Sequence, residues 1–535
     1  MQFMDPDAIS PLGHLIDRRA RAVVEEALGD TRVVLVNGAR QCGKSTLVRL
    51  VAEAGGARWR TLDNESTRRA AGEDPVGFIA EPGPVVIDEI QRVPELLLAI
   101  KERVDRDARP GQFLLTGSAR VLGLHSLADA LPGRMETLEL FPFSQGEIAG
   151  SPDGFVDAVF GFAGDLRHDS DLSRSDYAEL LVRGGFPEAV ARTSARRRER
   201  FLDSYVADLI ARDVGQLSEI ERPSEMRALI RLVAARSAQL LRPTALGNEI
   251  ALPHSTVARY LELLELVFLI KRIPAWSRNL SRRATSAPKV TMVDSGIAAN
   301  LLDMDATHLV RPGAPFGALL EGFVLMELSR QLTWSRERVE LFHYRTRDQV
   351  EVDAVLENRR GQVVGIEVKA ASTVRREDFR GLRHLQQRLG SDFVVGVVLY
   401  TGPHTLPFGD GLRAIPSVRS GPSTRRSDST LPDAEGGSAP RRAVRPLFEV
   451  PFQGGPVRRL PAPAEGSDQR GQQSGEADRA DRPVPRHLGT GRGRPELQGV
   501  LDVGGGQVGP EGQPGLSGVL GDVGEPLDRP ARRRC

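Results

Sequence analysis

The fold is decided by the stretch Gly38-Ala-Arg-Gln-Cys-Gly-Lys-Ser45, which follows directly on the apolar run Arg32-Val-Val-Leu-Val-Asn37. The first stretch is a complete G-x-x-x-x-G-K-[ST] phosphate-binding loop. The residues from Lys44 to Glu53 then show the apolar spacing of an amphipathic helix. Strand, loop and helix therefore follow one another as the motif requires, and the sequence predicts a nucleotide as the ligand.

Each part of this loop has a chemical role. Gly38 and Gly43 let the backbone curl so that successive N–H groups point at phosphate oxygens. Lys44 can reach the β and γ phosphates, and the Ser45 hydroxyl can hold Mg²⁺. We therefore predict ATP and Mg²⁺ as cofactors. The predicted nucleotide-binding residues are Gly38, Ala39, Arg40, Gln41, Cys42, Gly43, Lys44, Ser45 and Thr46.

Length and composition bound the remaining possibilities. A chain of 535 residues is too long for one ordinary core, so we expect several domains. The 72 basic and 71 acidic residues give a net charge of +1, which excludes a globally basic nucleic-acid coat protein. With Cys42 and Cys535 as its two cysteines, the chain has no disulfide framework, which favours a reducing compartment. Apolar runs are too short for a membrane span and the N-terminus lacks a signal pattern, so we expect a cytoplasmic protein with no membrane partner.

Residues 12–150 alternate short apolar strands with helical patterns. This alternation predicts an α/β domain, a P-loop AAA-like parallel sheet covered by helices. Residues 95–104 predict one of those helices, and residues 151–175, rich in Gly, Asp and Ser, predict a surface loop. The candidate strands are residues 32–37, 59–62, 85–88, 112–116 and 136–140.

The middle region, residues 176–283, is predicted to be helical and to end in a winged helix. Apolar spacing of three and four predicts helices at residues 177–213 and 224–241. Residues 244–264 read as helix, turn and helix, and the β-prone run 267–273 follows at once. This order is typical of a winged helix-turn-helix.

Residues 284–416 predict a second α/β region, whose candidate strands are residues 341–344, 350–356, 363–368 and 393–400. Residues 417–535 are different: they are rich in Pro, Gly and Arg and contain no Lys, Asn, Ile, Met, Tyr or Trp. Such a composition predicts a disordered tail. Because most of the missing residues have A/T-rich codons, we also consider the tail a spurious product of translation in a wrong frame or past the natural stop.

A second element of the phosphate site is the apolar stretch Pro84-Val-Val-Ile-Asp-Glu-Ile-Gln91, which ends in two acids. We predict that Asp88 supports Mg²⁺ through a bound water and that Glu89 polarises the attacking water as general base. The next candidate strand ends in hydroxyls, so Thr116 or Ser118 is placed to sense the γ phosphate; an ordinary turn of small residues explains them equally well.

Arg134, in Leu131-Pro-Gly-Arg-Met135, is a candidate charge-neutralising finger. Such a residue would act across a subunit interface, so this role goes with a homo-oligomer. Surface arginines are abundant in the chain, which weakens the assignment.

Together these motifs resemble the prokaryotic AAA-type ATP-binding proteins that carry a C-terminal domain of unknown function. The resemblance spans residues 12–416 and implies an AAA-like ATPase module, a helical and winged-helix middle, and a C-terminal domain similar to restriction endonucleases. This chain has Cys42 where the family more often has valine, a benign change because the position contributes mainly backbone, and it has a tail that members lack. The motifs are Gly38-Ala-Arg-Gln-Cys-Gly-Lys-Ser45, Leu62-Asp-Asn-Glu65, Val86-Ile-Asp-Glu-Ile-Gln91, Leu115-Thr-Gly-Ser-Ala119, Pro142-Phe-Ser144, Gly184-Gly-Phe-Pro-Glu188 and Arg212-Asp213.

A second active site is predicted in the restriction-endonuclease-like domain. Such nucleases need an acid and then an acid-x-lysine on adjacent strands, so that two carboxylates hold Mg²⁺ while the lysine steadies water or phosphate charge. Asp353, Glu367 and Lys369 fit this pattern, with Asp353 and Glu367 as metal ligands. Glu321, in a predicted helix, could supply a third metal-binding carboxylate. By itself the pattern is weak: the alternative is a charged antiparallel hairpin with a solvated face, and such folds often persist without activity.

The output of the nucleotide site is left open by the sequence. The run 271–283 is locally basic and holds Trp276, which suits DNA phosphate contacts, although winged helices also dock proteins. His254 and His343 lack neighbours at metal-ligand spacing. The leading hypothesis is an AAA-type ATPase that drives a conformational change and associates with DNA. The alternative is a non-catalytic nucleotide-dependent switch or scaffold that docks a protein partner.

Overall fold

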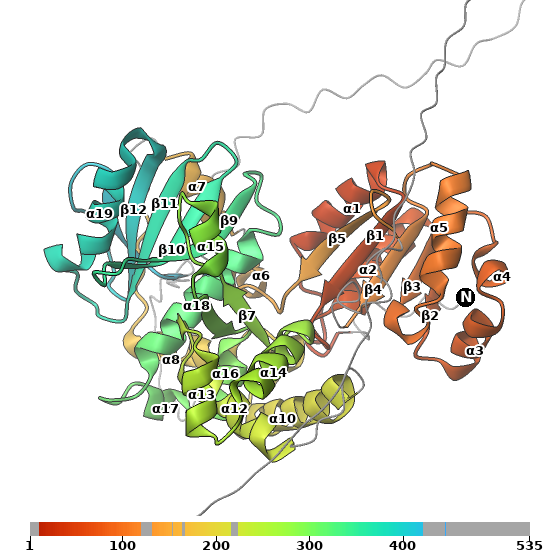
Figure 1. The fold of residues 1–535 in the computed structure, drawn as a ribbon, viewed down its shortest axis with the longest axis horizontal. Coiled ribbons are helices and arrows are strands. Elements are labelled where there is room, and N and C mark those ends of the chain that lie inside the picture. The colour runs from red at the N-terminus through yellow and green to blue at the C-terminus, as the bar shows by residue number, and fades with distance from the viewer. Residues whose placement is uncertain are drawn as a thin grey trace, which may run out of the picture. The chain divides into compact units, whose positions relative to one another are not determined.

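The computed structural model describes residues 10–118, 131–151, 153–162, 166–215, 223–420 and 444–445. Its first sheet has five parallel strands in the order β2-β3-β4-β1-β5 (Figure 1). The strands are β1 (Val33–Gly38), β2 (Arg58–Thr61), β3 (Val85–Asp88), β4 (Phe113–Gly117) and β5 (Met135–Leu140). The predicted parallel α/β sheet is confirmed, and the ends of its strands lie within one residue of the predicted ones.

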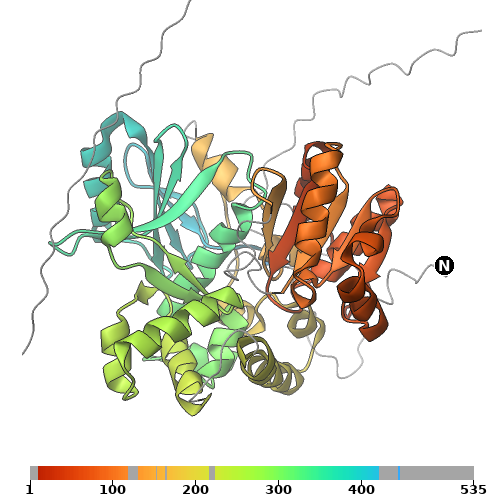
Figure 2. The same cartoon turned by 45° about the vertical axis from the view of Figure 1, so that its right-hand side comes forward.

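Helices cover both faces of this sheet because successive strand residues point to opposite sides (Figure 2). Val34 and Val36 lie in one buried cluster with residues of the first two helices, whereas Val33 and Leu35 lie in a second cluster with residues of the other three. The helices are α1 (Ala20–Asp30), α2 (Lys44–Gly55), α3 (Glu65–Glu73), α4 (Pro75–Ile79) and α5 (Leu96–Arg106), and a 3₁₀ turn, η2 (Ile90–Arg92), follows β3.

The middle region is helical, with two corrections to the predicted elements. Residues 151–175 are not simply a loop, because Phe155, Val156 and Val159 are buried on a short helix. The predicted helix 224–241 ends at Ala235. Ala238 has a positive φ of 65° and donates its N–H to the Val290 carbonyl, and a strand begins at the next residue, Gln239. The helices are α6 (Gln145–Ala149), α7 (Phe155–Phe160), α8 (Arg174–Arg183), α9 (Pro187–Ala191), α10 (Ala195–Asp208), the π-helix η4 (Leu209–Val214) and α12 (Pro223–Ala235).

A helix-turn-helix follows, formed by α13 (Pro243–Glu249) and α14 (His254–Leu266). A three-stranded sheet in the order β6-β8-β7 adjoins it, and its neighbouring strands are antiparallel. Its strands are β6 (Gln239–Leu240), β7 (Ile270–Ile273) and β8 (Lys289–Met292), and α15 (Leu280–Thr285) lies between the last two. The identification of this unit as a winged helix stays a prediction.

The C-terminal region contains a mixed six-stranded sheet in the order β13-β14-β12-β11-β10-β9. Strands β9 and β10 pair antiparallel with their neighbours, whereas β11, β12 and β14 run parallel to one another. The strands are β9 (Val339–Arg345), β10 (Glu351–Asn358), β11 (Val363–Lys369), β12 (Phe393–Tyr400), β13 (Leu406–Pro407) and β14 (Leu412–Pro416). The helices are α16 (Ser295–Leu301), α17 (Ala306–Leu309), α18 (Phe316–Gln331), η5 (Arg376–Phe379), α19 (Arg380–Leu389) and η6 (Gly390–Asp392).

The packed chain continues a little beyond the predicted boundary at residue 416. Ser417 donates its N–H to the Tyr400 carbonyl over 2.8 Å, and Val418 is buried. A short ladder then joins β15 (Arg419–Ser420) and β16 (Val444–Arg445). The remainder of the predicted tail lies outside the described residues.

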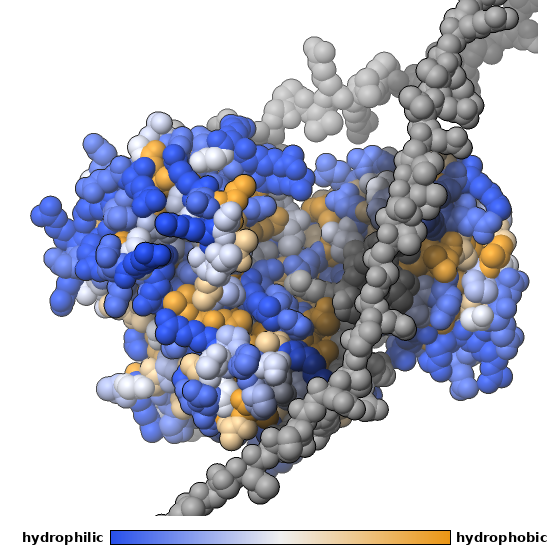
Figure 3. All heavy atoms as spheres, viewed as in Figure 1, coloured by the Kyte–Doolittle hydropathy of each residue, from blue (hydrophilic) through white to orange (hydrophobic). Residues whose placement is uncertain are grey.

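Hydrophilic residues cover most of the face drawn in Figure 3. Large hydrophobic side chains with substantial exposure include Val76, Leu98, Leu280 and Leu406, which lie on separate elements. In the part of the chain that the structure describes, no helix has the length and apolar character needed to cross a bilayer.

Candidate functional site

The phosphate loop lies between β1 and α2, at the carboxyl edge of the parallel sheet. Gly43 caps α2 with a φ of 101°, and Gln41 also has a positive φ, 58°. A side chain at Gly38 would place its Cβ 2.1 Å from the Leu140 carbonyl oxygen, so glycine is required there. These backbone shapes turn the loop toward the first turn of α2, where free N–H groups favour anions.

Lys44 is buried at the start of α2, with 4% of its surface exposed. Its Nζ donates to the carbonyl oxygens of Gly38 and Ala39 over 3.0 and 2.9 Å. The ammonium group is thus held over the loop, at the position from which the predicted contact with phosphates would be made. Cys42 is fully buried beneath the loop, and burial raises the pKa of its thiol.

Three side chains meet beside this lysine, one from α2 and two from the adjacent strands β3 and β4. Ser45 Oγ and Thr116 Oγ1 donate to the same oxygen of Asp88, over 2.9 and 2.6 Å. Burial and the neighbouring Glu89 raise the pKa of Asp88, while the two hydroxyls and Lys44 oppose the shift. A hydroxyl and a carboxylate are oxygen donors of the kind that Mg²⁺ prefers, so these residues fit the predicted metal.

Glu89 sits at the strand end in the left-handed backbone region, with φ 60°. Its N–H donates to Thr116 Oγ1 over 2.9 Å, and its carboxylate accepts from Ser118 Oγ over 2.7 Å and from Gln91 Nε2. The structure therefore brings both predicted sensor candidates to the two acids: Thr116 contacts Asp88 and Ser118 contacts Glu89.

Two cavities open beside these residues. One, of about 350 Å³, is lined by loop residues that include Lys44 and Ser45 and by apolar residues that include Leu15, Ile16 and Pro187. The other, of about 590 Å³, lies beside Glu89 and Ser118. Its lining includes four arginines, Arg40, Arg68, Arg92 and Arg212. No short sequence motif marks the convergence of these four arginines, because they lie far apart in the chain.

Arg134 is not brought to the loop of its own chain. It precedes β5 at the amino edge of the sheet, where its carbonyl accepts from Val33 at the start of β1, whereas the phosphate loop follows the other end of β1. Its guanidinium pairs with Asp105. An action across a subunit interface stays a prediction.

Two residues at the loop were missed by the sequence analysis. Arg18 Nη1 donates to the Cys42 carbonyl over 2.8 Å, and Tyr205 on α10 donates to the Arg40 carbonyl over 3.2 Å. Both are far from the loop in sequence, and no local spacing marks them. Arg18 is recognisable only through its partners, among them Glu147, which lies 129 positions away.

The predicted nuclease residues lie on the neighbouring strands β10 and β11, and a lysine from β8 lies among the carboxylates. Lys289 of β8 is 2% exposed, and its Nζ lies 2.6 Å from Glu321, 3.0 Å from Asp353 and 3.4 Å from Glu351. Burial lowers the pKa of this lysine, but the surrounding carboxylates outweigh it and raise the pKa, so the ammonium stays charged. A divalent cation shared by Glu321 and Asp353 would have to displace it. Within the described residues, no group of three or more His, Cys, Asp and Glu side chains is arranged to hold a metal ion.

Glu367 and Lys369 lie on β11, the strand that pairs with the strand of Asp353. They pair with each other over 2.8 Å, and the second carboxylate oxygen of Glu367 is buried without a hydrogen-bond partner. Burial and then the charge of Asp353 raise the pKa of Glu367 to about 8. They border a cavity of about 880 Å³ whose lining carries both acidic and basic side chains. Its mixed charge gives no clear preference for nucleic acid.

The basic run 271–283 is largely used inside the molecule. Trp276 is buried with Phe342 and Tyr344 and is not exposed for stacking on a base. The ion pairs of the run are Lys271–Glu139, Arg272–Glu265, Arg278–Asp392 and Arg283–Glu357. The suggestion that Trp276 is available for contacts with nucleic acid is therefore wrong. The four ion pairs also make these basic residues less available for contacts with DNA phosphates.

Comparison with known proteins supports the nucleotide-binding part. Residues 30–149 match a family model described as an AAA domain. Residues 174–308 and 316–419 match two models described as domains of unknown function, DUF8612 and DUF4143. The resemblance of the C-terminal region to restriction endonucleases therefore stays a prediction.

The relatives themselves carry no stated function. An uncharacterized protein of Mycobacterium tuberculosis is 29% identical over 409 residues, which cover 75% of this chain and 84% of that protein. An uncharacterized protein of Haemophilus influenzae is 24% identical over 254 residues, 46% of this chain and 57% of that protein.

Among solved structures, a Walker-type ATPase of Pyrococcus abyssi is 16% identical, covers 54% of this chain and 96% of its own, and gives a TM-score of 0.34. DnaA of Aquifex aeolicus bound to AMPPCP is 13% identical, covers 49% and 93%, and gives 0.25. These scores are too low to guide the functional argument. The match over residues 30–149 and the loop geometry support an AAA-type P-loop ATPase fold, which implies nucleotide binding.

Proposed function

We propose that this chain binds ATP at residues 38–46 and hydrolyses it, and that the turnover changes the conformation of the regions that follow the AAA domain. The observation that carries the proposal is the cluster in which Ser45 and Thr116 both donate to Asp88, directly beside the buried Lys44. This cluster combines the donors that cradle phosphates with the oxygens that suit Mg²⁺.

Each residue has a defined part. Lys44 binds the β and γ phosphates once it releases the loop carbonyls, and Ser45 and Asp88 hold Mg²⁺, which neutralises charge on the phosphates. Glu89 orients and deprotonates the attacking water as general base. Ser118 and Gln91 hold the Glu89 carboxylate in place, and Thr116 links both acids.

The test compares Lys44→Ala with a matched variant, Lys101→Ala, which removes a lysine from α5, on the other face of the sheet. Binding of a fluorescent ATP analogue and release of phosphate are measured for both. We expect Lys44→Ala to lose affinity and turnover and Lys101→Ala to retain them. Unchanged affinity and turnover in Lys44→Ala would contradict the proposal.

For the output, the contacts favour a nucleotide-dependent switch over a DNA-cleaving enzyme. Lys289 lies among the carboxylates that a nuclease would use for Mg²⁺, and four cations of the basic run are engaged in ion pairs. The alternative, a nuclease acting through Asp353, Glu367 and Lys369, is tested by nicking of supercoiled plasmid with Mg²⁺ or Mn²⁺ in each nucleotide state. Cleavage by the wild type that is lost in Asp353→Ala would establish the nuclease and reject the switch.

A further inference from the structure

We propose that residues 141–148, here called the linking segment, couple the phosphate loop to helix α18 of the C-terminal region, and that Arg18 is the positioning residue that joins the loop to this segment. The proposal rests on ATP binding at the loop. It concerns two sequence motifs, Pro142-Phe-Ser144 and Gly184-Gly-Phe-Pro-Glu188, to which the hydrolysis mechanism gives no role.

The loop end of the connection is the buried guanidinium of Arg18. Its Nη1 donates to the Cys42 carbonyl over 2.8 Å, its Nη2 to the Phe141 carbonyl over 2.7 Å, and its Nε to Glu147 over 3.0 Å. One rigid, planar group therefore contacts the phosphate loop and both ends of the linking segment. A shift of the Cys42 carbonyl must move this group or break a buried hydrogen bond.

Glu147 is fixed from several sides. It closes a capping box with Ser144 at the start of α6, and its Oε1 also accepts from the Arg19 N–H over 2.9 Å. Its side chain is 1% exposed. Because removing one partner of a buried pair leaves an uncompensated charge, Arg18 and Glu147 are expected to move together.

Between these two ends, the linking segment is bound by two charged residues of α18. Arg330 Nε donates to the Pro142 carbonyl over 3.0 Å, and Glu327 Oε2 accepts the Gln145 N–H over 3.1 Å. Arg330 and Glu327 also pair with each other over 2.9 Å, and their side chains are 4% and 1% exposed. The segment is thus held between two buried ionic groups, one at the phosphate loop and one on α18.

The second motif seats the middle of the segment. Phe143 donates its N–H to the Gly185 carbonyl over 2.9 Å, and a Cβ at Gly185 would lie 2.2 Å from the Phe143 carbonyl oxygen. Gly184 has a φ of 65°, and Asp294 accepts the Gly185 N–H over 2.7 Å. Gly185 is therefore required for the close approach of this turn to the linking segment, and Gly184 for its positive φ and for its closeness to the Asp294 carboxylate.

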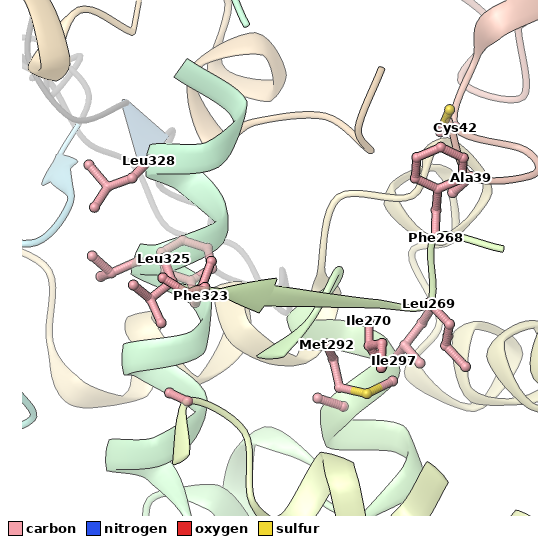
Figure 4. Close-up of a cluster of buried hydrophobic side chains, with 14 of the residues drawn as sticks. Ala39, Cys42, Phe268, Leu269, Ile270, Met292, Ile297, Phe323, Leu325 and Leu328 are labelled. Carbon is pink, nitrogen blue, oxygen red and sulfur yellow. The ribbon is translucent and has the colours of Figure 1, made fainter. Parts of the chain in front are cut away.

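Apolar packing adds a further contact to the loop. Ala39 and Cys42 belong to the same buried cluster as Phe268, which precedes β7, and Phe323 and Leu325 of α18 (Figure 4). Figure 4 shows the Phe268 side chain pointing toward the two loop residues. The back of the loop packs against the core rather than against solvent. A nucleotide-induced displacement of Ala39 or Cys42 would therefore displace the side chains packed against them.

The test follows hydrogen exchange of the α18 backbone in the full chain, with and without saturating AMPPNP. In the wild type we expect AMPPNP to change the exchange rates of residues 316–331 several-fold. In Arg18→Met, which keeps length but removes the charge, we expect nucleotide to bind at higher concentration and the response of α18 to disappear at saturation. Arg18→Lys should restore part of the response.

The matched control is Tyr205→Phe, which removes a different hydrogen bond to the loop, at the Arg40 carbonyl, and leaves the linking segment intact. We expect it to keep the α18 response. If Arg18→Met does not fold, Glu147→Gln replaces it, since this variant keeps the shape of the side chain and weakens the same pair. Coupling between two sites is reciprocal. Arg330→Met is therefore expected to change the affinity for nucleotide in chains that retain Arg18, and to leave it unchanged in the Arg18→Met background.

The outcomes separate the two proposals. A wild type that binds no nucleotide would overturn both ATP binding and the coupling. A wild type that binds AMPPNP without any change in α18, or an Arg18→Met variant with the full response at saturation, would overturn the coupling and leave ATP binding standing.

Discussion

The ammonium group of Lys289 lies 3.0 Å from Oδ1 of Asp353, inside the cluster of carboxylates that the sequence predicts as a metal site. The lysine comes from β8, outside the predicted nuclease motif, and also contacts Glu321 and Glu351. A buried carboxylate cluster needs a counter-charge. Lys289 supplies a positive charge from within the chain, through ion pairs with Asp353, Glu321 and Glu351.

Without the positive charge of Lys289, the stability of the carboxylate cluster should depend on an added cation. We expect Lys289→Met to lower the free energy of unfolding by about 3 to 5 kcal/mol, the cost of leaving a buried charge without its partner. Part of this loss should return on adding Mn²⁺, while the wild type without nucleotide should be insensitive to Mn²⁺. Urea unfolding with and without Mn²⁺ measures both.

Lys369→Met is the matched control, because the Lys369 side chain is 31% exposed and its ammonium group pairs with Glu367. Its loss should be smaller, about 1 kcal/mol or less. Stabilisation of the wild type by Mn²⁺ that disappears in Asp353→Ala would contradict a lysine-filled site.

Glu89 is predicted to matter for turnover and not for affinity. We expect Glu89→Gln to bind ATP like the wild type and to hydrolyse it about 10² to 10⁴-fold more slowly, since an amide cannot take a proton from water. Single-turnover phosphate release and titration with an ATP analogue separate the two quantities. Glu53→Gln, on the exposed end of α2, is the control and should leave both unchanged; turnover at the wild-type rate in Glu89→Gln would require another base.

The AAA-domain sheet was predictable because its determinants are local. Residues 33–36 are apolar, the whole strand at residues 33–38 is buried, and Gly38 and Gly43 mark the turn that follows. Where distant contacts decide, the sequence misled: residues 239–240 have helical spacing but form a strand, because Val290 pairs with Gln239 and Lys289 with Leu240.

The same distinction applies to the candidate site. Lys44, Ser45, Asp88 and Glu89 occur in short motifs whose spacing carries the chemistry. Arg18 and Lys289 do not: each enters its cluster from another part of the chain, and its role exists only after folding. Trp276 was misjudged for the complementary reason, because its basic neighbours suggested exposure while Phe342 and Tyr344 bury it.

Arg134 offers a test of oligomeric action. Its pairing with Asp105 at the amino edge of the sheet leads us to expect unchanged ATP affinity in Arg134→Ala and little loss of stability, because solvent screens an exposed ion pair. If Arg134 acts on the nucleotide of a neighbouring subunit, Arg134→Ala will reduce ATP turnover only at protein concentrations where the chain self-associates. Turnover measured across a dilution series, with Arg106→Ala as control, decides this; reduced affinity in the dilute protein would contradict the observed placement.

His343 gives the fold a defined sensitivity to acid. Its ring is buried, with Nε2 3.0 Å from the Ala287 carbonyl oxygen, and burial lowers its pKa from 6.5 to about 4. Between pH 6.5 and 4 the unfolded chain therefore binds a proton that the folded chain does not. The free energy of unfolding should fall as the pH drops through this window, by up to about 3 kcal/mol from this residue.

In His343→Gln the fall should be shallower, whereas His254→Gln, which alters an exposed histidine at the start of α14, should keep the wild-type slope. Urea unfolding at half-unit steps of pH measures the slopes, and equal slopes in the wild type and His343→Gln would show that another group controls the acid transition.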